Sequence, residues 1–192
     1  MNCLQCSKKS CRSAVSCGAE SFDQETVLET YRQQDEKSAV KAAARLVDGG
    51  RAGTLSRIEE LVEFSKEMGY RHIGLAYCYG MEDIARCTGD ILKESGFRVT
   101  GISCTVGALR QDQINQNSSL PGVSCDPLGQ AAQLKSQRVD LAVLIGLCLG
   151  HDMLFTRHYS GDMTTLVVKD RPFSHDPVKG IRKHCATVPP AV

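Results

Sequence analysis

The sequence predicts an α/β fold with an open, mainly parallel, four-stranded sheet and flanking helices in a Rossmann-like arrangement, preceded by a short cysteine-rich module. Two observations predict the sheet. Short apolar runs alternate with amphipathic helical patterns after about residue 70, and these runs are apolar at successive positions, as buried parallel strands usually are. A third observation, the crowding of cysteine into the first seventeen residues, predicts the module.

Four cysteines with the spacing C-x2-C-x4-C-x5-C open the chain: Cys3, Cys6, Cys11 and Cys17. Thiolates select zinc, copper(I) and iron–sulfur cores. Because so short and polar a segment has no hydrophobic core, metal binding is expected to supply its folding free energy. We therefore predict a cluster-binding module at residues 1–20 and an α/β domain at residues 21–192.

Two helices are expected before the sheet. Apolar residues recur at three- and four-residue spacings over residues 23–47, and the glycine-rich segment 49–53 ends this pattern. A second helix is expected from about Ser56, where Glu59 completes a capping box, to Gly69.

The rest of the chain alternates between strands and helices. Strands are expected at residues 73–78, 97–104, 140–148 and 164–168. Helices are expected at about residues 81–95, 128–137 and 152–158, and a polar loop at residues 110–124. This alternation predicts right-handed βαβ units and a parallel sheet.

Three cysteines occupy equivalent positions at the ends of predicted strands: Cys78, Cys104 and Cys148. The C-terminal ends of parallel strands share one edge of a sheet, and ligands bind in the crevice outside that edge. Cys125 precedes a helix that begins at the same edge and is a fourth candidate ligand. We predict a second cysteine site there. The alternative is that each of these cysteines is an ordinary core residue, because free cysteine is often buried.

Two histidines lie on this edge, and two further cysteines do not. His151 follows the third strand, directly before Asp152, which is expected to cap the next helix, and His175 follows the fourth strand. Either histidine could donate a hydrogen bond to a cluster or ligand, transfer protons near neutral pH, or be an ordinary loop residue. Cys87 is expected on the core face of a helix as a structural residue, and Cys185 in the tail has no assigned role.

The cysteine spacing favours iron–sulfur clusters over zinc. Structural zinc sites with four thiolates usually pair two C-x2-C knuckles about 15–20 residues apart, whereas the N-terminal run has one knuckle followed by gaps of four and five residues. Irregular spacing suits a cuboidal cluster that ligands approach from several directions, although known ferredoxin spacings are not matched. We expect two four-iron clusters (4Fe–4S), with zinc at the N-terminal site as the alternative.

Composition limits the classes of function. The formal net charge of +1 and the lack of a basic block argue against a nucleic-acid or membrane-surface partner. Neither an apolar stretch of about 18 residues nor an apolar signal core is present, so a cytoplasmic protein is expected. In a reducing compartment, ten cysteines indicate metal ligands or redox groups rather than disulfides. The chain also lacks the G-x-G-x-x-G and Walker-type motifs of nucleotide sites.

Several distinctive stretches resemble a small family of cysteine-rich proteins from anaerobic bacteria and archaea: residues 57–60, 146–155 and 164–171, the turn at 125–127 with residues 130–131, and the N-terminal cysteines. This family is catalogued as a domain of unknown function, and its members are often labelled metal-binding proteins. The resemblance covers nearly the whole chain. It implies a metal or iron–sulfur protein but no particular reaction or substrate, and it implies no ligand role for Cys87.

Three hypotheses about function follow. The first is a two-cluster redox protein or enzyme in which the N-terminal cluster passes electrons to the edge site. If only Cys78, Cys104 and Cys148 ligate that site, one iron is open to a small exogenous ligand, whereas a fourth ligand, Cys125, closes it and favours electron transfer. The second is a non-catalytic metal or cluster carrier or sensor, and the third is a thiol enzyme with Cys148 as nucleophile before His151. The expected partner is a redox protein or a small ligand, while enzymatic activity and homodimerisation are left open.

Overall fold

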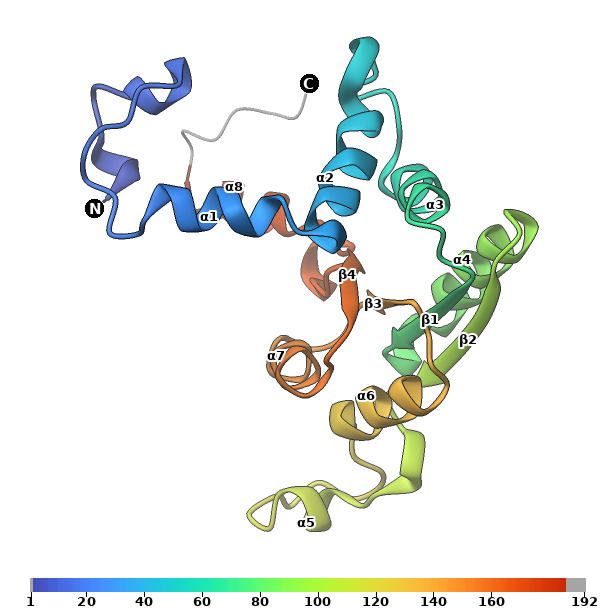
Figure 1. Cartoon of the computed structure of the whole chain (residues 1–192). Helices are drawn as coiled ribbons and strands as arrows, with labels where there is room; N and C mark the ends of the chain where they lie inside the picture. Colours follow the sequence, from blue (N-terminus) through green and yellow to red (C-terminus); the bar gives the residue numbers. More distant parts are fainter. Residues whose placement is uncertain (1, 186–192) are drawn as a thin grey trace. The chain divides into compact units, whose positions relative to one another are not determined.

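The computed structural model of the chain describes residues 2–185. Its internal contacts divide the chain into two units, one ending at Gly50 and the other beginning at Arg51. Figure 1 shows the helices and strands of both units. The N-terminal unit extends beyond residue 20, because two helices belong to it together with the cysteine-rich segment. The metal module at residues 1–20 stays a prediction.

The N-terminal unit is helical and has almost no buried side chains. Its elements are η1 (Cys3–Gln5), η2 (Ser10–Ser13), α1 (Gln24–Tyr31), α2 (Gln34–Val47) and η3 (Asp48–Gly50). Among residues 2–50, Ala42 alone is buried. Burial of apolar surface therefore contributes little to the stability of this unit.

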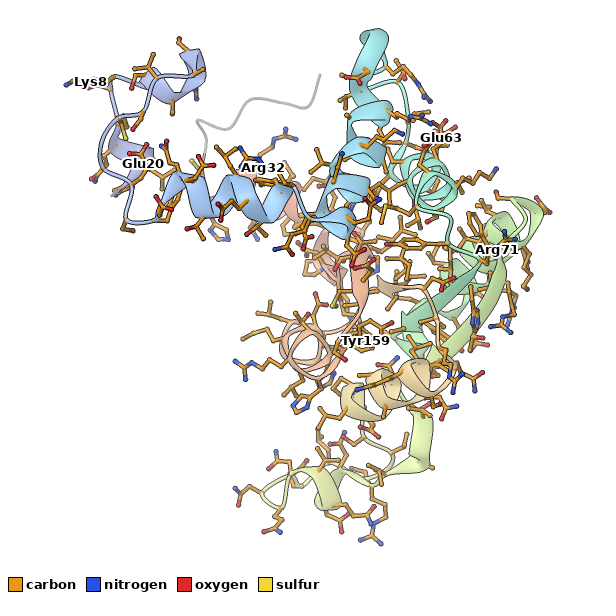
Figure 2. All side chains as sticks on the ribbon, viewed as in Figure 1. Lys8, Glu20, Arg32, Glu63, Arg71 and Tyr159 are labelled. Carbon is orange, nitrogen blue, oxygen red and sulfur yellow. The ribbon has the colours of Figure 1, made fainter. Side chains whose placement is uncertain are left out.

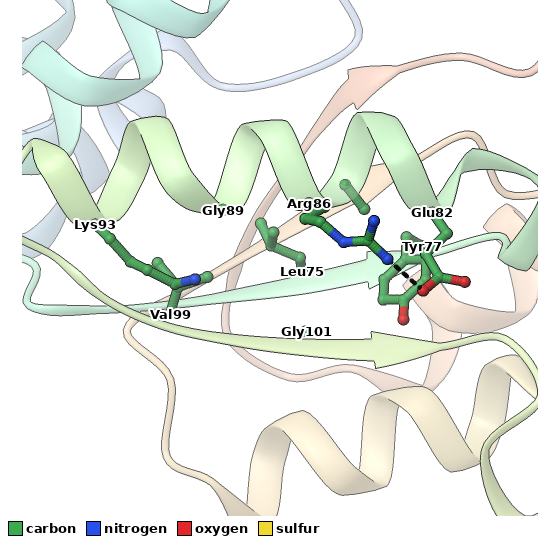
Figure 3. Close-up of a pocket in the computed structure, with 9 residues that line it drawn as sticks. Leu75, Tyr77, Glu82, Arg86, Gly89, Lys93, Val99 and Gly101 are labelled. Atoms are coloured by element: carbon green, nitrogen blue, oxygen red, sulfur yellow. Dashed lines mark hydrogen bonds and ion pairs between the residues drawn. The ribbon is translucent and has the colours of Figure 1, made fainter.

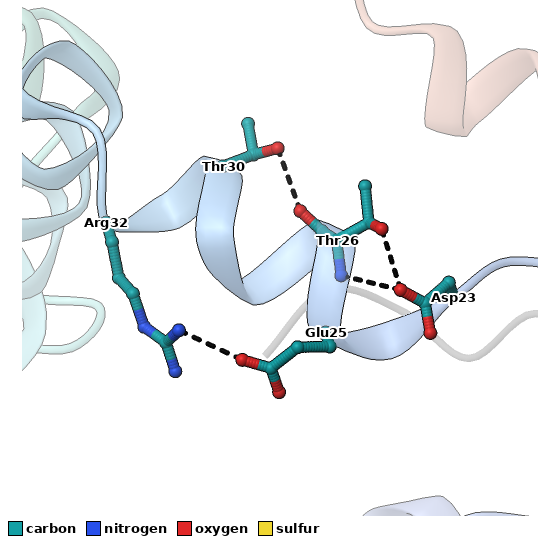
Figure 4. Close-up of polar contacts among 5 residues, drawn as sticks. All are labelled: Asp23, Glu25, Thr26, Thr30 and Arg32. Carbon is teal, nitrogen blue, oxygen red and sulfur yellow. Dashed lines mark hydrogen bonds and ion pairs between the residues drawn. The ribbon is translucent and has the colours of Figure 1, made fainter.

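The single helix expected over residues 23–47 is two helices. The carboxylate of Asp23 caps α1 by accepting the backbone N–H of Thr26 at 2.9 Å, and Arg32 pairs with Glu25 at 3.0 Å (Figure 4). The chain then leaves the helical conformation at Gln33, with φ −65° and ψ 151°. Since neither glycine nor proline marks this break, the sequence pattern gave no sign of it.

The second unit contains the predicted sheet, and the α/β fold class is confirmed. Its strands are β1 (His72–Tyr77), β2 (Arg98–Ser103), β3 (Leu141–Ile145) and β4 (Asp162–Val167). They lie in the order β2-β1-β3-β4, and every neighbouring pair is parallel. The chain thus moves from β1 to one side for β2 and to the other side for β3.

Helices cover both faces of this sheet, in two layers. Apolar residues of α3 (Arg57–Glu67) and α4 (Glu82–Glu94) pack on one face against Ile73, Leu75 and Val143. On the other face, α6 (Pro127–Ser136) and α7 (Leu149–His158) pack against Ala142 and Leu144 (Figures 1 and 2). Because successive strand residues point to opposite faces, coverage on both sides requires continuous apolar runs in the central strands.

Several predicted helix and strand ends are confirmed, and others are wrong. The capping box of Ser56 and Glu59 begins α3, and Gly69, with φ 73°, follows its end as expected. The third strand ends at Ile145 rather than Cys148, because Gly146 takes a left-handed φ of 60°. Helix α7 therefore begins earlier than predicted, directly after Cys148.

The remaining elements are short. They are η4 (Tyr79–Met81), η5 (Val106–Ala108), α5 (Gln111–Ile114), η6 (Arg171–Phe173) and α8 (Pro177–His184). The polar loop at 110–124 contains α5 and a single bridge between Arg110 and Val123, and the sequence pattern did not predict α8. Among the described residues, no helix combines the length and the apolar character needed to cross a membrane.

Candidate cysteine site at the carboxyl edge of the sheet

The site lies where the strand order reverses direction. Strand β1 is flanked by β2 on one side and by β3 on the other, so the connections after β1 and β3 diverge at the carboxyl edge. Such a reversal leaves a crevice in which α/β proteins bind their ligands. Cys78 directly follows β1, and Cys148 is the third residue after the end of β3, so both lie at the carboxyl edge of the sheet beside this reversal.

Cys78 and Cys104 are neighbours on adjacent strands. The last register pair of β1 and β2 joins Tyr77 to Ser103, and the next residue on each strand is a cysteine. The Cys104 N–H donates to the Tyr77 carbonyl at 2.8 Å, which continues the ladder, and the two thiols are close enough for each to affect the pKa of the other. Both cysteines are buried, so the geometry of the sheet itself positions the two sulfur atoms.

Cys125 joins the site from the long loop before α6. Its thiol donates to the Cys104 sulfur at an Sγ–Sγ distance of 3.5 Å. The next residue, Asp126, donates its N–H to the Cys104 carbonyl at 2.7 Å and caps α6 by accepting the Gly129 N–H at 2.8 Å. A Cβ on Gly129 would lie 2.1 Å from the Asp126 carboxylate, so this tight cap requires glycine.

Lys169 contacts two cysteines that follow different strands, a role that no sequence motif indicated. It follows β4, and its Nζ lies 2.6 Å from the Cys78 sulfur and 3.6 Å from the Cys148 sulfur. Contacts therefore link all four predicted edge cysteines, from Cys125 through Cys104 and Cys78 to Lys169 and Cys148. The position of Lys169 in the sequence could have indicated this role, because a residue directly after the fourth parallel strand also lies on this edge.

The two central thiols have opposite electrostatic environments. Burial raises the pKa of Cys104 to about 12, and the neighbouring thiols Cys125 and Cys78 add to this effect. Burial alone would raise the pKa of Cys78, but the hydrogen bond and charge of Lys169 and the Gly80 backbone amide outweigh it and lower that pKa. The Cys78 contact in turn raises the pKa of Lys169 despite burial. Lys169 therefore favours the thiolate form of Cys78, whereas burial favours the neutral form of Cys104.

The comparison with known proteins agrees with the resemblance found in the sequence. Residues 17–166 match the family described as "Protein of unknown function (DUF1847)". The chain belongs to this family. The chain is also 32% identical over 179 residues to the uncharacterized protein MJ0455 of Methanocaldococcus jannaschii, with 92% of this chain and 91% of that protein covered. No solved structure matches.

The DUF1847 match contains all four edge cysteines. Cys78, Cys104, Cys125 and Cys148 lie inside residues 17–166, together with the last N-terminal cysteine, Cys17. Lys169 lies just beyond the matched segment. The family description assigns no reaction to DUF1847 proteins.

The two edge histidines flank the cysteines but differ in their surroundings. His151 is half-buried in the first turn of α7, where burial and the nearby Lys169 charge lower its pKa and favour the neutral ring. The Asp170 backbone N–H donates to Nδ1 of His175 at 3.2 Å, so the neutral ring carries its proton on Nε2. Asp152 does not cap α7 as predicted, because Cys148 occupies the N-cap position.

The N-terminal cysteines of this DUF1847 protein are near the surface. Cys3, Cys11 and Cys17 are exposed and Cys6 is half-buried. The Lys9 N–H donates to the Cys6 sulfur at 3.4 Å, and Cys17 contacts Glu20 at 3.8 Å. Within residues 2–185, no three histidine, cysteine or acidic side chains are arranged to hold a single metal ion, at this end or at the sheet edge.

Two cysteines and one groove lie outside the site. Cys87 is exposed on α4, so the expectation that it faces the core is wrong. The reason is that Ala85, Thr88 and Gly89 form the buried face of that helix. Cys185 is also exposed. A groove of about 210 Å³ between α4 and β2 is lined by residues that include Tyr77, Glu82, Arg86 and Lys93, and no cysteine is among its described lining residues (Figure 3).

Proposed function

We propose that this protein is an iron–sulfur protein with a cluster at the carboxyl edge of the sheet and a second at its N-terminus. One observation supports the first part: four cysteines from separate segments lie at one edge of the sheet, and contacts through Cys104, Cys78 and Lys169 link them. Four soft sulfur ligands suit an iron–sulfur core or a thiophilic ion far better than magnesium or calcium.

A cluster fits these residues better than a single zinc ion does. Zinc holds each thiolate at about 2.3 Å, so its four sulfur atoms must surround one point. Here the ammonium group of Lys169 lies between the Cys78 and Cys148 sulfurs, where a shared ion would have to be. A cluster is contacted from outside at several corners and accepts hydrogen bonds on its sulfurs, which gives the Lys169 N–H groups a role.

The residues of the site would then divide their tasks. When bound, an iron–sulfur cluster supplies one-electron transfer and, at an open iron, Lewis acidity. Cys78 and Cys104 are held rigidly by the sheet, while Cys148 and Cys125 approach from the other side and from the loop. Lys169 would offset the negative charge of the cluster and its thiolates. A neutral His151 would be available near Lys169 as a hydrogen-bond donor or acceptor. If Cys125 is not a ligand, one iron is free for a small exogenous ligand.

At the N-terminus, Cys3, Cys6, Cys11 and Cys17 are the proposed ligands of the second cluster, with zinc as the alternative. Support comes from the cysteine spacing and from the near absence of buried apolar residues in residues 2–50. The role proposed for the whole chain is electron transfer to a redox partner protein, or redox chemistry on a small ligand.

The deciding experiment measures iron, zinc and acid-labile sulfide per chain in protein purified without oxygen. About eight irons and eight sulfides are expected for two four-iron clusters. The variant Cys148→Ser should lose about half of both, while the control Cys87→Ser, an exposed cysteine on α4, should keep them. Full iron and sulfide in Cys148→Ser, or wild-type protein with neither, would contradict the proposal for the edge site.

A second candidate function is supported by the short contact of 2.6 Å between Cys78 and Lys169. A thiolate stabilised by an ammonium group is a nucleophile, so a cluster-free site would suit thiol chemistry centred on Cys78 rather than on Cys148. In metal-free protein, Lys169→Met should slow alkylation of Cys78 at neutral pH by about tenfold, because the thiolate loses its partner. The control Lys93→Met removes an exposed lysine paired with Asp90 and should not change the rate.

A further inference from the structure

A buried glutamine spans the two strands that carry the first two cysteines. Gln130 lies on α6 and its side chain is fully buried. Its Nε2 donates to the Tyr77 carbonyl of β1 at 3.1 Å and to the Ile102 carbonyl of β2 at 2.8 Å. One amide group therefore contacts both strands at the point where they leave the sheet.

The two acceptors lie one and two residues before the cysteines. Tyr77 immediately precedes Cys78, and Ile102 lies two residues before Cys104. The Tyr77 carbonyl also accepts the Cys104 N–H, so this oxygen receives one hydrogen bond from the neighbouring strand and one from Gln130. A shift of either strand end would break one of these bonds, and the spacing of the two sulfurs would change with it.

The orientation of the amide is determined by its partners. If the amide were flipped, its oxygen would face two carbonyl oxygens, and none of these three atoms can donate a hydrogen bond. In the observed orientation the Oε1 atom is buried and makes no hydrogen bond within the described residues. An unpaired buried acceptor is unfavourable, so an apolar side chain would serve better here if packing were the only requirement.

We infer that Gln130 is a positioning residue that fixes the separation of the Cys78 and Cys104 sulfur atoms for cluster binding. This inference deepens the proposed function of the edge site and rests on it. Gln130 touches neither sulfur and acts through the backbone of the two strand ends. Its removal should therefore alter the ligand geometry while all of the proposed ligands remain.

The first test compares Gln130→Met with Leu134→Met in protein purified without oxygen. Leu134 is fully buried one turn further along α6, so both variants place a methionine in the same layer. Gln130→Met should change the electron paramagnetic resonance spectrum of the edge cluster and reduce its iron content by about half, while Leu134→Met should match wild type. Identical spectra and iron content for Gln130→Met and wild type would overturn the inference.

The second test uses metal-free protein with Cys125→Ser and Cys148→Ser, which leaves Cys78 and Cys104 as the edge thiols. Neighbouring strands lie about 4.8 Å apart, within the Cα range of a disulfide, so these thiols can be equilibrated with a glutathione redox buffer. Gln130→Met should lower their effective concentration about tenfold, a shift of about 30 mV in reduction potential. An unchanged equilibrium would overturn the inference.

The two tests separate the failures of the two proposals. Absence of a cluster from the wild-type edge would overturn the proposed function, yet the disulfide equilibrium would still report whether Gln130 positions the thiols. If Gln130→Met does not fold, Gln130→Asn keeps the amide but shortens the side chain by one methylene group, so it should not reach both carbonyls. An effective thiol concentration below that of wild type is then expected, and a value equal to wild type would count against positioning.

Discussion

At the scale of single residues, the site depends on pairs of groups that modify one another. Lys169 lowers the pKa of Cys78, and burial among thiols raises that of Cys104, although both cysteines leave the same edge of the sheet. The sequence places each residue on the edge but does not show which thiol has the charged neighbour. That depends on the turn after β4, which directs Lys169 toward Cys78 and Cys148.

At the opposite edge of the sheet, Asp140 provides a residue-scale test of pH dependence. Its carboxylate accepts the backbone N–H groups of Arg71 at 2.7 Å and His72 at 2.9 Å. Burial alone would raise the pKa of Asp140, but these hydrogen bonds and the neighbouring cationic groups outweigh it and lower the pKa.

We expect Asp140→Asn to reduce the free energy of unfolding by about 1 kcal/mol at pH 7. Because the folded pKa is depressed, the carboxylate stabilises the protein above the unfolded value of 3.8, and this contribution is lost as the pH falls through the folded pKa. Urea unfolding at pH 7 and near pH 3 measures the difference. An equal difference in the free energy of unfolding between wild type and variant at both pH values would contradict a stabilising role for the Asp140 carboxylate.

At the scale of elements, the turns after the strands determine where the cysteines lie. Gly146 ends β3 with φ 60°, and a Cβ there would lie 2.7 Å from Cγ of Met81. This turn allows Cys148 to become the N-cap of α7. The sequence pattern ran the strand on to Cys148 because residues 146–148 contain no charged or strongly polar side chain.

Gly146→Ala should therefore destabilise the protein by about 2 kcal/mol or more, because the left-handed backbone and the contact with Met81 both oppose a Cβ. Gly150→Ala is the matched control. Gly150 lies in the first turn of α7, a Cβ there would meet nothing within 4 Å, and alanine favours the helix. Thermal unfolding of both variants measures the contrast. Equal melting temperatures would show that the turn after β3 tolerates a side chain.

At the scale of the whole molecule, the two units have different sources of stability. The unit that begins at Arg51 has a core on both faces of its sheet, whereas Ala42 is the only buried residue among residues 2–50. If the N-terminal cysteines bind metal, binding and folding of that unit are coupled. Removal of the metal should then affect the two units unequally.

We expect a chelator to make residues 2–50 sensitive to protease while residues 51–185 stay protected. Limited proteolysis followed by mass spectrometry, before and after chelation, measures this difference. Cys11→Ser should reproduce the chelated pattern without a chelator, and the exposed Cys87→Ser should not. Equal protection of residues 2–50 with and without metal would show that the unit does not depend on a bound ion.

The sequence by itself determined the α/β class, the four parallel strands and the edge on which four cysteines lie. Hydrophobic runs and glycine turns are local signals, and the rules for parallel sheets convert them into a shared edge. The structure bore out the fold and the capping box of α3 and corrected the length of β3, the start of α7 and the burial of Cys87.

Only the tertiary structure decided which side chains meet at that edge. The break at Gln33, the buried face of α4, the contact of Lys169 with Cys78 and Cys148, and the bridge made by Gln130 all depend on residues distant in sequence or on turn geometry. A periodic pattern reports which face of an element is apolar. The partner that a polar side chain finds across the fold depends on how the elements pack, because hydrogen bonds require donor and acceptor to lie within about 3 Å of each other.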